Sequence, residues 1–249
     1  MANQLFEEQE NQRHIKVKGL YNLRDLGGYP SFCGRHTIWK QIFRSDSLHN
    51  LAIEGQQQIV EMNVKTVIDL RRPQEIEQAK NVFSDSELVK YINISLIDIS
   101  PFEDNNNLPN GLKEMYLKTL YERHEAIRNV FKQILTAEGA VLFHCAVGKD
   151  RTGLISGLLL DLVEVPHSII AEDYAFSNQC LAPILPEMLS SRPVALNEEQ
   201  YNRFIQCKPE YMLDVLKMLD DVYDGTAGYL RAIGLTDNDI NALQKKLIS

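Results

Sequence analysis

A cysteine and an arginine in the middle of the chain are spaced to act together on a phosphate group. Cys145 ends an apolar run that is short enough to be one buried strand, and Arg151 follows six positions later, just before residues 154–160, which predict a buried helix. The N–H groups of the first helical turn have no internal partners, and the helix dipole is positive there, so this turn can hold an anion. The guanidinium of Arg151 adds a planar, two-pronged donor that fits two phosphate oxygens.

The same spacing predicts that the thiol of Cys145 faces the centre of a phosphate held by Arg151. The helix terminus, Arg151 and Lys149 all favour the thiolate over the neutral thiol. A thiolate aimed at phosphorus is a nucleophile for phosphoryl transfer that needs no metal ion. The competing interpretation is a buried cysteine beside an ordinary exposed charge cluster. We favour the anion site, because Gly-Lys-Asp-Arg-Thr-Gly over residues 148–153 is an unusual sequence for a plain turn from strand to helix.

Residues 144–153 resemble the signature loop of the cysteine-dependent protein tyrosine phosphatase superfamily. The form with an acid beside the arginine, Gly-Lys-Asp-Arg, is similar to that of the bacterial tyrosine and lipid phosphatases. Further segments that resemble this subfamily are residues 22–29, 43–48, 67–71, 173–178 and the stretch from residue 228 onward. The resemblance implies an α/β fold of the protein tyrosine phosphatase type and a phosphomonoester hydrolase that forms a phosphocysteine and uses no cofactor.

The resemblance also assigns roles to the residues of the loop and to residues outside it. Cys145 attacks the phosphorus in line, while Arg151 and the loop N–H groups bind the three equatorial oxygens. Residues expected to line a bound phosphate or sulfate are Ala146, Val147, Gly148, Lys149 and Thr152. Residues expected to support the site are His144, Asp69, Arg71 and Asp98. Lys149 is expected to add positive charge at the rim, which would admit substrates with additional phosphates.

Several of these residues keep an alternative role. His144 either lies behind the loop and fixes it, or is a simple core histidine. Thr152 either donates its hydroxyl to the sulfur or caps the helix. Asp69 is expected to be structural, paired with Arg151 or Arg71.

The general acid that protonates the leaving oxygen is not settled by the sequence. The usual tyrosine phosphatases carry this acid in a Trp-Pro-Asp string, but Trp39 is the only tryptophan here and no Pro-Asp follows it. Two candidates remain. Asp150 lies within the loop and matches the acidic residue of the resembling subfamily, and Asp98 lies on a long polar loop after a strand. We favour Asp150.

Composition limits the partners of the protein. A formal net charge of −8 argues against nucleic acid, and against a membrane surface held by charge alone. Residues 154–160 form the longest apolar run, which is too short for an integral membrane segment. The four cysteines show neither paired nor metal-binding spacing. With no secretory signal visible at the start, we expect a cytoplasmic protein without a metal, and signal-less export is the alternative.

The order of elements predicts one phosphatase domain over residues 15–249, preceded by an N-terminal arm on the surface over residues 1–14. Strands over residues 38–43, 64–70 and 88–94 alternate with helices, which favours a mostly parallel central sheet with helices on both faces. Residues 112–135 predict one amphipathic helix. Residues 179–210 carry four prolines and predict a helical lid or a plain helical insertion.

Four other functions compete with a broad phosphatase. A sulfurtransferase also uses a loop cysteine, but Arg-Thr-Gly over residues 151–153 argues against it. A nucleotide-binding loop is disfavoured, because no Ser or Thr follows Lys149 to hold Mg²⁺. A phosphate-binding module without catalysis is expected to have lost Cys145 or Arg151, and both are present. A phosphatase restricted to phosphoinositides stays open beside one that acts on phosphotyrosine proteins, with phosphoserine and phosphothreonine as further targets.

Overall fold

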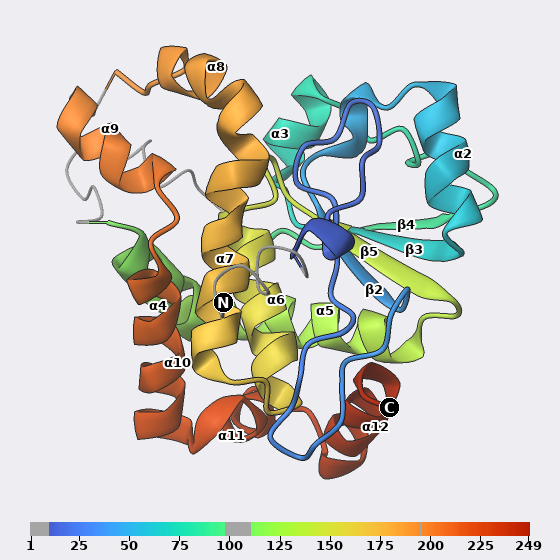
Figure 1. Cartoon of the computed structure of the whole chain (residues 1–249), viewed down its shortest axis with the longest axis vertical. Helices are drawn as coiled ribbons and strands as arrows, with labels where there is room; N and C mark the ends of the chain where they lie inside the picture. The colour runs from blue at the N-terminus through green and yellow to red at the C-terminus, as the bar shows by residue number, and fades with distance from the viewer. Residues whose placement is uncertain (1–9, 98–110, 195) are drawn as a thin grey trace.

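The computed structural model describes residues 10–97, 111–194 and 196–249, which form a five-stranded sheet with helices on both faces (Figure 1). The strands are β1 (Arg24–Asp25), β2 (Ile42–Ser45), β3 (Val64–Asp69), β4 (Lys90–Asn93) and β5 (Ala140–His144). The first helices are α2 (Ile53–Glu61), α3 (Pro73–Gln78), α4 (Leu112–Glu122), α5 (His124–Thr136), α6 (Asp150–Leu162) and α7 (His167–Leu181). They are followed by α8 (Leu185–Ser190), α9 (Glu198–Ile205), α10 (Pro209–Tyr223), α11 (Gly225–Ala232) and α12 (Asp237–Leu247). The α/β architecture expected from the sequence is confirmed.

The strand that leads to Cys145 lies in the centre of the sheet. The strand order is β1-β2-β5-β3-β4, and every pair is parallel except β1 with β2. In this register His144, the last residue of β5, lies between Ser45 of β2 and Asp69 of β3. Because parallel strands end at one edge of the sheet, the three segments that follow them meet at that edge. Cys145 is therefore surrounded by residues 46–47 on one side and 70–71 on the other.

Alternate residues of β5 enter two separate cores. Val141 and Phe143 join the larger core with α4 to α7 and α10 to α12, whereas Ala140 and Leu142 join the smaller core with α2 and residues 17–23. The period of two follows from the pleat of a strand. In Figure 1, α2 lies on one side of the sheet and α5 on the other. Both faces of the central strand are thus covered, which holds the start of the signature loop rigidly.

Two expected elements differ from the structure. Residues 112–135 form two helices rather than one, because Arg123 leaves the helical region with φ −110 and ψ 32. The break lets α4 pack on α10 while α5 packs on α12. Strand β2 begins at Ile42 rather than at residue 38, since Lys40 has a φ of 60 and interrupts extended structure there.

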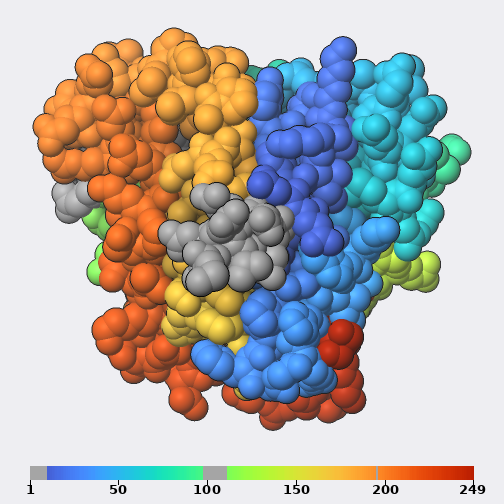
Figure 2. Space-filling model, in the orientation of Figure 1, coloured from blue at the N-terminus to red at the C-terminus, as the bar shows by residue number. Residues whose placement is uncertain are grey.

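Residues 179–210 are largely helical where the structure describes them, and they carry α8 and α9. In the space-filling view these two helices form one upper corner of the molecule, and α2 forms the other (Figure 2). Whether this segment moves as a lid stays a prediction. Among the described helices, none combines the length and the apolar character needed to cross a membrane.

The described part of the N-terminal arm, residues 10–14, is packed into the molecule, in contrast to the surface position expected for the arm. Glu10 and Arg13 are buried. Arg13 donates from Nε to the carbonyl of Gly27 at 2.9 Å, and its guanidinium lies 3.7 Å from the ring centroid of Tyr29. Residues 10–14 therefore contribute to the packed domain.

Two arginines and one aspartate form a buried charge cluster between the sheet and α7. Arg24 and Arg44 are fully buried and contact opposite oxygens of Asp173, at 2.7 Å and 2.6 Å. Tyr29 donates a further hydrogen bond to Asp173 at 2.8 Å. Burial opposes ionisation of Asp173, but the two arginines outweigh it and hold the pKa of this carboxyl below its ordinary value.

Substitution of Asp173 by Asn should cost about 3–5 kcal/mol of unfolding free energy, because it removes the carboxylate that two buried guanidinium groups share. Because the folded-state pKa is lowered, this stability is present above the ordinary aspartate range and is lost as the pH falls through the folded-state value. Urea unfolding followed by circular dichroism measures the effect. The control is Asp221→Asn, which removes one partner of the exposed pair with Lys217 and should leave the midpoint unchanged. Equal effects of the two substitutions would contradict the buried cluster as a source of stability.

Candidate active site

The signature loop is the short connection between β5 and α6. It runs from Cys145 to Lys149, and Asp150 begins α6. Gly148 has a φ of 68, a region that favours glycine, and a Cβ at this position would lie 2.5 Å from the carbonyl oxygen of Ser45. Glycine is therefore required here for two reasons, the backbone conformation and the close approach of the loop to the end of β2.

Every carbonyl of this loop is held by a donor that lies away from the loop's inner face. The Cys145 and Ala146 carbonyls accept from His144 Nδ1 and from the Ser47 N–H, each at 3.0 Å. The next two carbonyls both accept from Asn22 Nδ2. The Lys149 carbonyl accepts from the Gly153 N–H at 2.8 Å, as the first bond of the helix.

The contacts of these carbonyls determine the direction of the N–H groups of residues 146–149. In a trans peptide unit the C=O and the next N–H point in opposite directions. Carbonyls held outward therefore turn the N–H groups inward, and none of these four groups donates to a protein acceptor in the described part of the chain. Together with the unpartnered N–H groups at the start of α6, they form a concave nest for an anion around Cys145.

His144 lies behind the loop and is fully buried. Asn81 fixes its tautomer: Asn81 Oδ1 accepts from the Phe83 N–H, so Asn81 Nδ2 is the donor to His144 Nε2 at 2.8 Å. The proton of the neutral ring then sits on Nδ1 and is donated to the Cys145 carbonyl. Burial lowers the pKa of His144 and outweighs the nearby carboxylate of Asp69, which favours this neutral form.

The guanidinium of Arg151 is oriented by a residue that the sequence analysis missed. Arg151 donates to both carboxylate oxygens of Glu75, at 2.7 and 2.8 Å. Burial opposes ionisation of Glu75, but the hydrogen bonds and charge of Arg151 hold its pKa below the ordinary value. Two of the five guanidinium donors are used in this fork, which leaves others for an anion. The available signal was Pro73 at the start of α3 with an acid in the first turn.

Asp69 pairs with Arg71, one of the two partners expected for it. Arg71 donates from Nη2 at 2.7 Å and from Nε at 3.0 and 3.1 Å, and Tyr91 donates to the same carboxylate at 3.0 Å. Burial opposes ionisation of Asp69, but the hydrogen bonds and charge of Arg71 favour the carboxylate and its pKa is lowered. Both Asp69 and Arg71 are buried, so they brace the loop from behind.

Asp150 is held at the mouth of the loop by Tyr116 of α4 and by Lys149. Both contacts reach Oδ1, at 2.6 Å from the Tyr116 hydroxyl and 3.1 Å from Lys149 Nζ. The Tyr116 hydroxyl also lies 2.7 Å from that of Tyr174. The side chain of Asp150 is 27% exposed, so its carboxyl remains accessible from the site. The sequence carried no signal for Tyr116, which is an ordinary apolar-face position of its helix.

The expected position of Lys149 at the rim is wrong. Its side chain is 2% exposed, and Nζ donates to the carbonyls of Phe204 and Ile205 at the end of α9. The last carbonyls of a helix have no internal partners and carry the negative end of its dipole, which attracts this ammonium group. Burial opposes the charge of Lys149, but Asp150 outweighs it and its pKa is raised. Lys149 thus ties the loop to residues 179–210.

The remaining candidates divide between the site and the undescribed part of the chain. Thr152 is buried at the start of α6, and its hydroxyl has no hydrogen-bond partner among the described residues. Asp98 lies outside the described residues. Within residues 10–97, 111–194 and 196–249, no three His, Cys, Asp or Glu side chains are grouped so that they hold a metal ion.

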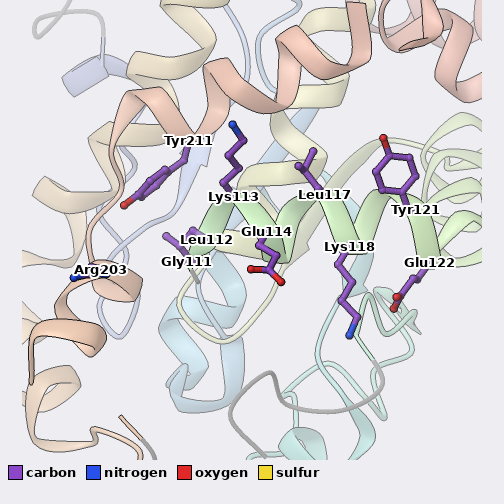
Figure 3. Close-up of a pocket in the computed structure, with 10 residues that line it drawn as sticks. All are labelled: Gly111, Leu112, Lys113, Glu114, Leu117, Lys118, Tyr121, Glu122, Arg203 and Tyr211. Carbon is purple, nitrogen blue, oxygen red and sulfur yellow. The ribbon is translucent and has the colours of Figure 1, made fainter. Parts of the chain in front are cut away.

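A groove of about 730 Å³ lies on the other side of α4, away from the loop (Figure 3). It is lined by Gly111, Leu112, Lys113, Glu114, Leu117, Lys118, Tyr121, Glu122, Arg203 and Tyr211. Lys113 is already paired with Asp214 at 2.9 Å. The groove contains no residue of the signature loop, so the nest around Cys145 remains the candidate site.

The chain is similar in sequence to known phosphatases. A family model described as the tyrosine phosphatase family matches residues 15–249. A tyrosine-protein phosphatase of Nostoc commune is 29% identical over 245 residues, which cover 88% of this chain and 81% of that protein. The triple specificity protein phosphatase PtpB of Mycobacterium tuberculosis is 22% identical over 281 residues, which cover 94% of this chain and 98% of that protein. The solved structure of P. aeruginosa TpbA with pTyr is 14% identical, with a TM-score of 0.37 and coverage of 85% of this chain and 88% of that one.

Substitution of Gly148 by Ala should weaken anion binding by the loop, because the added Cβ meets the backbone of Ser45 and Asp46. We expect vanadate affinity to fall by about 10²-fold or more, as the N–H groups are displaced. The control is Gly34→Ala, where φ is also positive, at 78, but nothing lies within 4 Å of the added Cβ. That variant should lose some stability through its φ alone and keep full vanadate affinity. Vanadate titration with thermal unfolding separates the two, and an unchanged affinity in Gly148→Ala would refute the close docking of the loop.

Proposed function

The chain belongs to the tyrosine phosphatase family and is a phosphatase, and we propose that it cleaves phosphomonoesters through a phosphocysteine on Cys145. The observation that carries this proposal is the orientation of the loop, whose carbonyls are all held outward around the cysteine. A nest of inward N–H groups with one guanidinium beside it is suited to the three equatorial oxygens of a phosphoryl group. A nucleophile at its centre is suited to in-line attack.

The proposed reaction has two steps, and Asp150 gives up a proton in the first and regains one in the second. In the first, the Cys145 thiolate forms a bond to phosphorus, the bond to the leaving oxygen breaks, and Asp150 gives that oxygen a proton. In the second, water attacks phosphorus and returns a proton to Asp150, and the sulfur leaves as a thiolate. Arg151 and the loop N–H groups stabilise the equatorial oxygens in both steps. The hydroxyl of Thr152, which has no hydrogen-bond partner among the described residues, supports a role in donating to the departing sulfur.

Asp150 remains our proposed general acid. Its contacts with Tyr116 and Lys149 both use Oδ1, which leaves Oδ2 to carry a proton toward the leaving group. Asp98 stays the alternative that the sequence left open. The two assignments differ in which variant becomes sensitive to the leaving group.

Phosphotyrosine proteins are the proposed substrates. The family description and the relative from Nostoc commune support phosphotyrosine, while the name of the mycobacterial relative, a triple specificity phosphatase, supports wider specificity. Phosphoinositides are the second candidate, but the burial of Lys149 removes the rim charge that favoured them. The cytoplasm remains the expected location, based on four cysteines that are all free.

The substrate class is tested with a panel of phosphotyrosine peptides, phosphoserine peptides and inositol lipids, with release of free phosphate as the readout. We expect the phosphotyrosine peptides to give the highest kcat/KM. A preference for inositol lipids by tenfold or more would replace phosphotyrosine as the assigned substrate.

Cys145→Ser should reduce turnover of p-nitrophenyl phosphate by at least about 10⁴-fold, because a hydroxyl without a base is a poor nucleophile. Vanadate affinity should persist, since the nest is unchanged. EDTA should leave the wild-type rate unaltered. The control is Cys33→Ser, which changes an exposed thiol and should keep full activity. Turnover that survives in Cys145→Ser, or that is lost in EDTA and restored by Mg²⁺, would overturn the thiolate mechanism.

Asp150→Asn should slow hydrolysis of alkyl phosphates by about 10²–10⁴-fold and that of p-nitrophenyl phosphate far less, because nitrophenolate leaves without a proton. Asp98→Asn is the matched comparison. If Asp98→Asn shows the leaving-group pattern and Asp150→Asn changes only binding, the acid is Asp98. A flat response of both variants would exclude both residues.

A further inference from the structure

We propose that Asn22 and Arg44 are positioning residues for the phosphoryl group. Their side chains turn two peptide units of the loop so that the N–H groups of Gly148 and Lys149 face inward. This inference rests on the proposed function and adds to it the origin of the loop's geometry. Both side chains donate to carbonyls of the loop, so both act through the loop backbone.

The carboxamide of Asn22 spans two successive carbonyls. Its Nδ2 atom donates to Val147 O at 3.1 Å and to Gly148 O at 3.0 Å. The opposite assignment of the amide would press Oδ1 against two carbonyl oxygens, so the contacts define its orientation. Asn22 is fully buried, and its Oδ1 has no partner in the described part of the chain. Among the described residues, the loop carbonyls are therefore the only hydrogen-bond partners of this side chain.

Asn22 is itself held in place by Asp46, two residues after Arg44 on the chain. Asp46 accepts from the Asn22 N–H at 3.0 Å and from the Tyr21 N–H at 3.0 Å. It also accepts from the Ser45 hydroxyl at 3.2 Å. The segment after β2 thus fixes the backbone from which the carboxamide reaches the loop.

Arg44 holds the second of these carbonyls from the other side. Its Nη2 donates to Gly148 O at 2.8 Å, while its Nη1 donates to Asp173 at 2.6 Å. A carbonyl oxygen has two lone pairs, and here Asn22 and Arg44 occupy both. The fork of Arg44 joins the loop to α7 through a side chain that is fully buried.

The hydrogen bonds from Asn22 and Arg44 are needed because the backbone of Gly148 is flexible. Glycine populates positive and negative φ about equally, so the peptide units on either side of it can rotate at little cost. A rotated unit would aim a carbonyl at the phosphate instead of an N–H. Donors fixed before the substrate arrives avoid reorganisation at the moment of reaction, when the equatorial oxygens need stabilisation most.

The experiment compares Arg44→Lys with Arg24→Lys. Both arginines are fully buried and both contact Asp173, but Arg24 reaches Ser177 with its second nitrogen and does not contact the loop. A lysine keeps the charge beside Asp173 and loses the second arm of the fork. We expect both variants to lose comparable stability. Only Arg44→Lys should lower kcat, by about 10²-fold, with a much smaller rise in KM, because the affected N–H groups act mainly in the transition state.

Asn22→Ala provides the second variant and buries no unpaired charge. Its kcat should fall by about 10²-fold, and the increase in melting temperature on adding vanadate should shrink relative to wild type. Measuring that increase within each variant removes the effect of a lowered starting stability. The inference is overturned if Asn22→Ala and Arg44→Lys keep wild-type kcat, or if Arg24→Lys loses as much kcat as Arg44→Lys. Failure of the proposed function is distinct, because wild-type protein would then show neither turnover nor competition by vanadate.

Discussion

In a trans peptide unit the C=O and N–H groups point in opposite directions, and the arrangement of the signature loop depends on this constraint. Four successive inward N–H groups require four outward carbonyls, and each of those needs a partner because a buried carbonyl without one is costly. The partners of these four carbonyls are a ring nitrogen, a backbone N–H after β2, and a buried carboxamide that donates to two of them, with a guanidinium on the last. The sheet order brings β2 and β3 to either side of β5, so that these donors are within reach.

Several charged side chains around this loop are buried or half-buried. Asp173 lies between Arg24 and Arg44, Asp69 accepts the fork of Arg71, and Glu75 accepts that of Arg151. Pairs of this kind often stabilise a fold less than apolar residues of the same volume, since both ions lose their hydration. Here these pairs fix the direction of the guanidinium groups. A planar guanidinium held by two hydrogen bonds has a defined direction, and a rigid anion site needs directed donors.

Two helices distant in sequence complete the mouth of the site. Helix α4 directs Tyr116 inward to Asp150, and its opposite face lines a separate groove. The end of α9 holds the ammonium group of Lys149. Lys149 also contacts Asp150, so the orientation of the proposed acid depends on both helices. Residues 179–210 are thereby connected to the chemistry, although they contribute no group that reacts.

The sequence by itself determined the features that depend on neighbouring residues. An apolar strand, a glycine-containing turn and a helix start predict Cys145 and Arg151 at one anion site, and alternation of strands and helices indicates the layered fold. Tertiary structure decided which side chains face one another. Glu75 lies 76 positions from Arg151, and Asn22 lies 126 from Gly148. Periodicity encodes the local path of the backbone, whereas the direction of a buried polar side chain follows from partners that only the packed sheet brings close. The expected rim position of Lys149 was wrong for this reason: no local pattern reveals that the carbonyls at the end of α9 lie beside it.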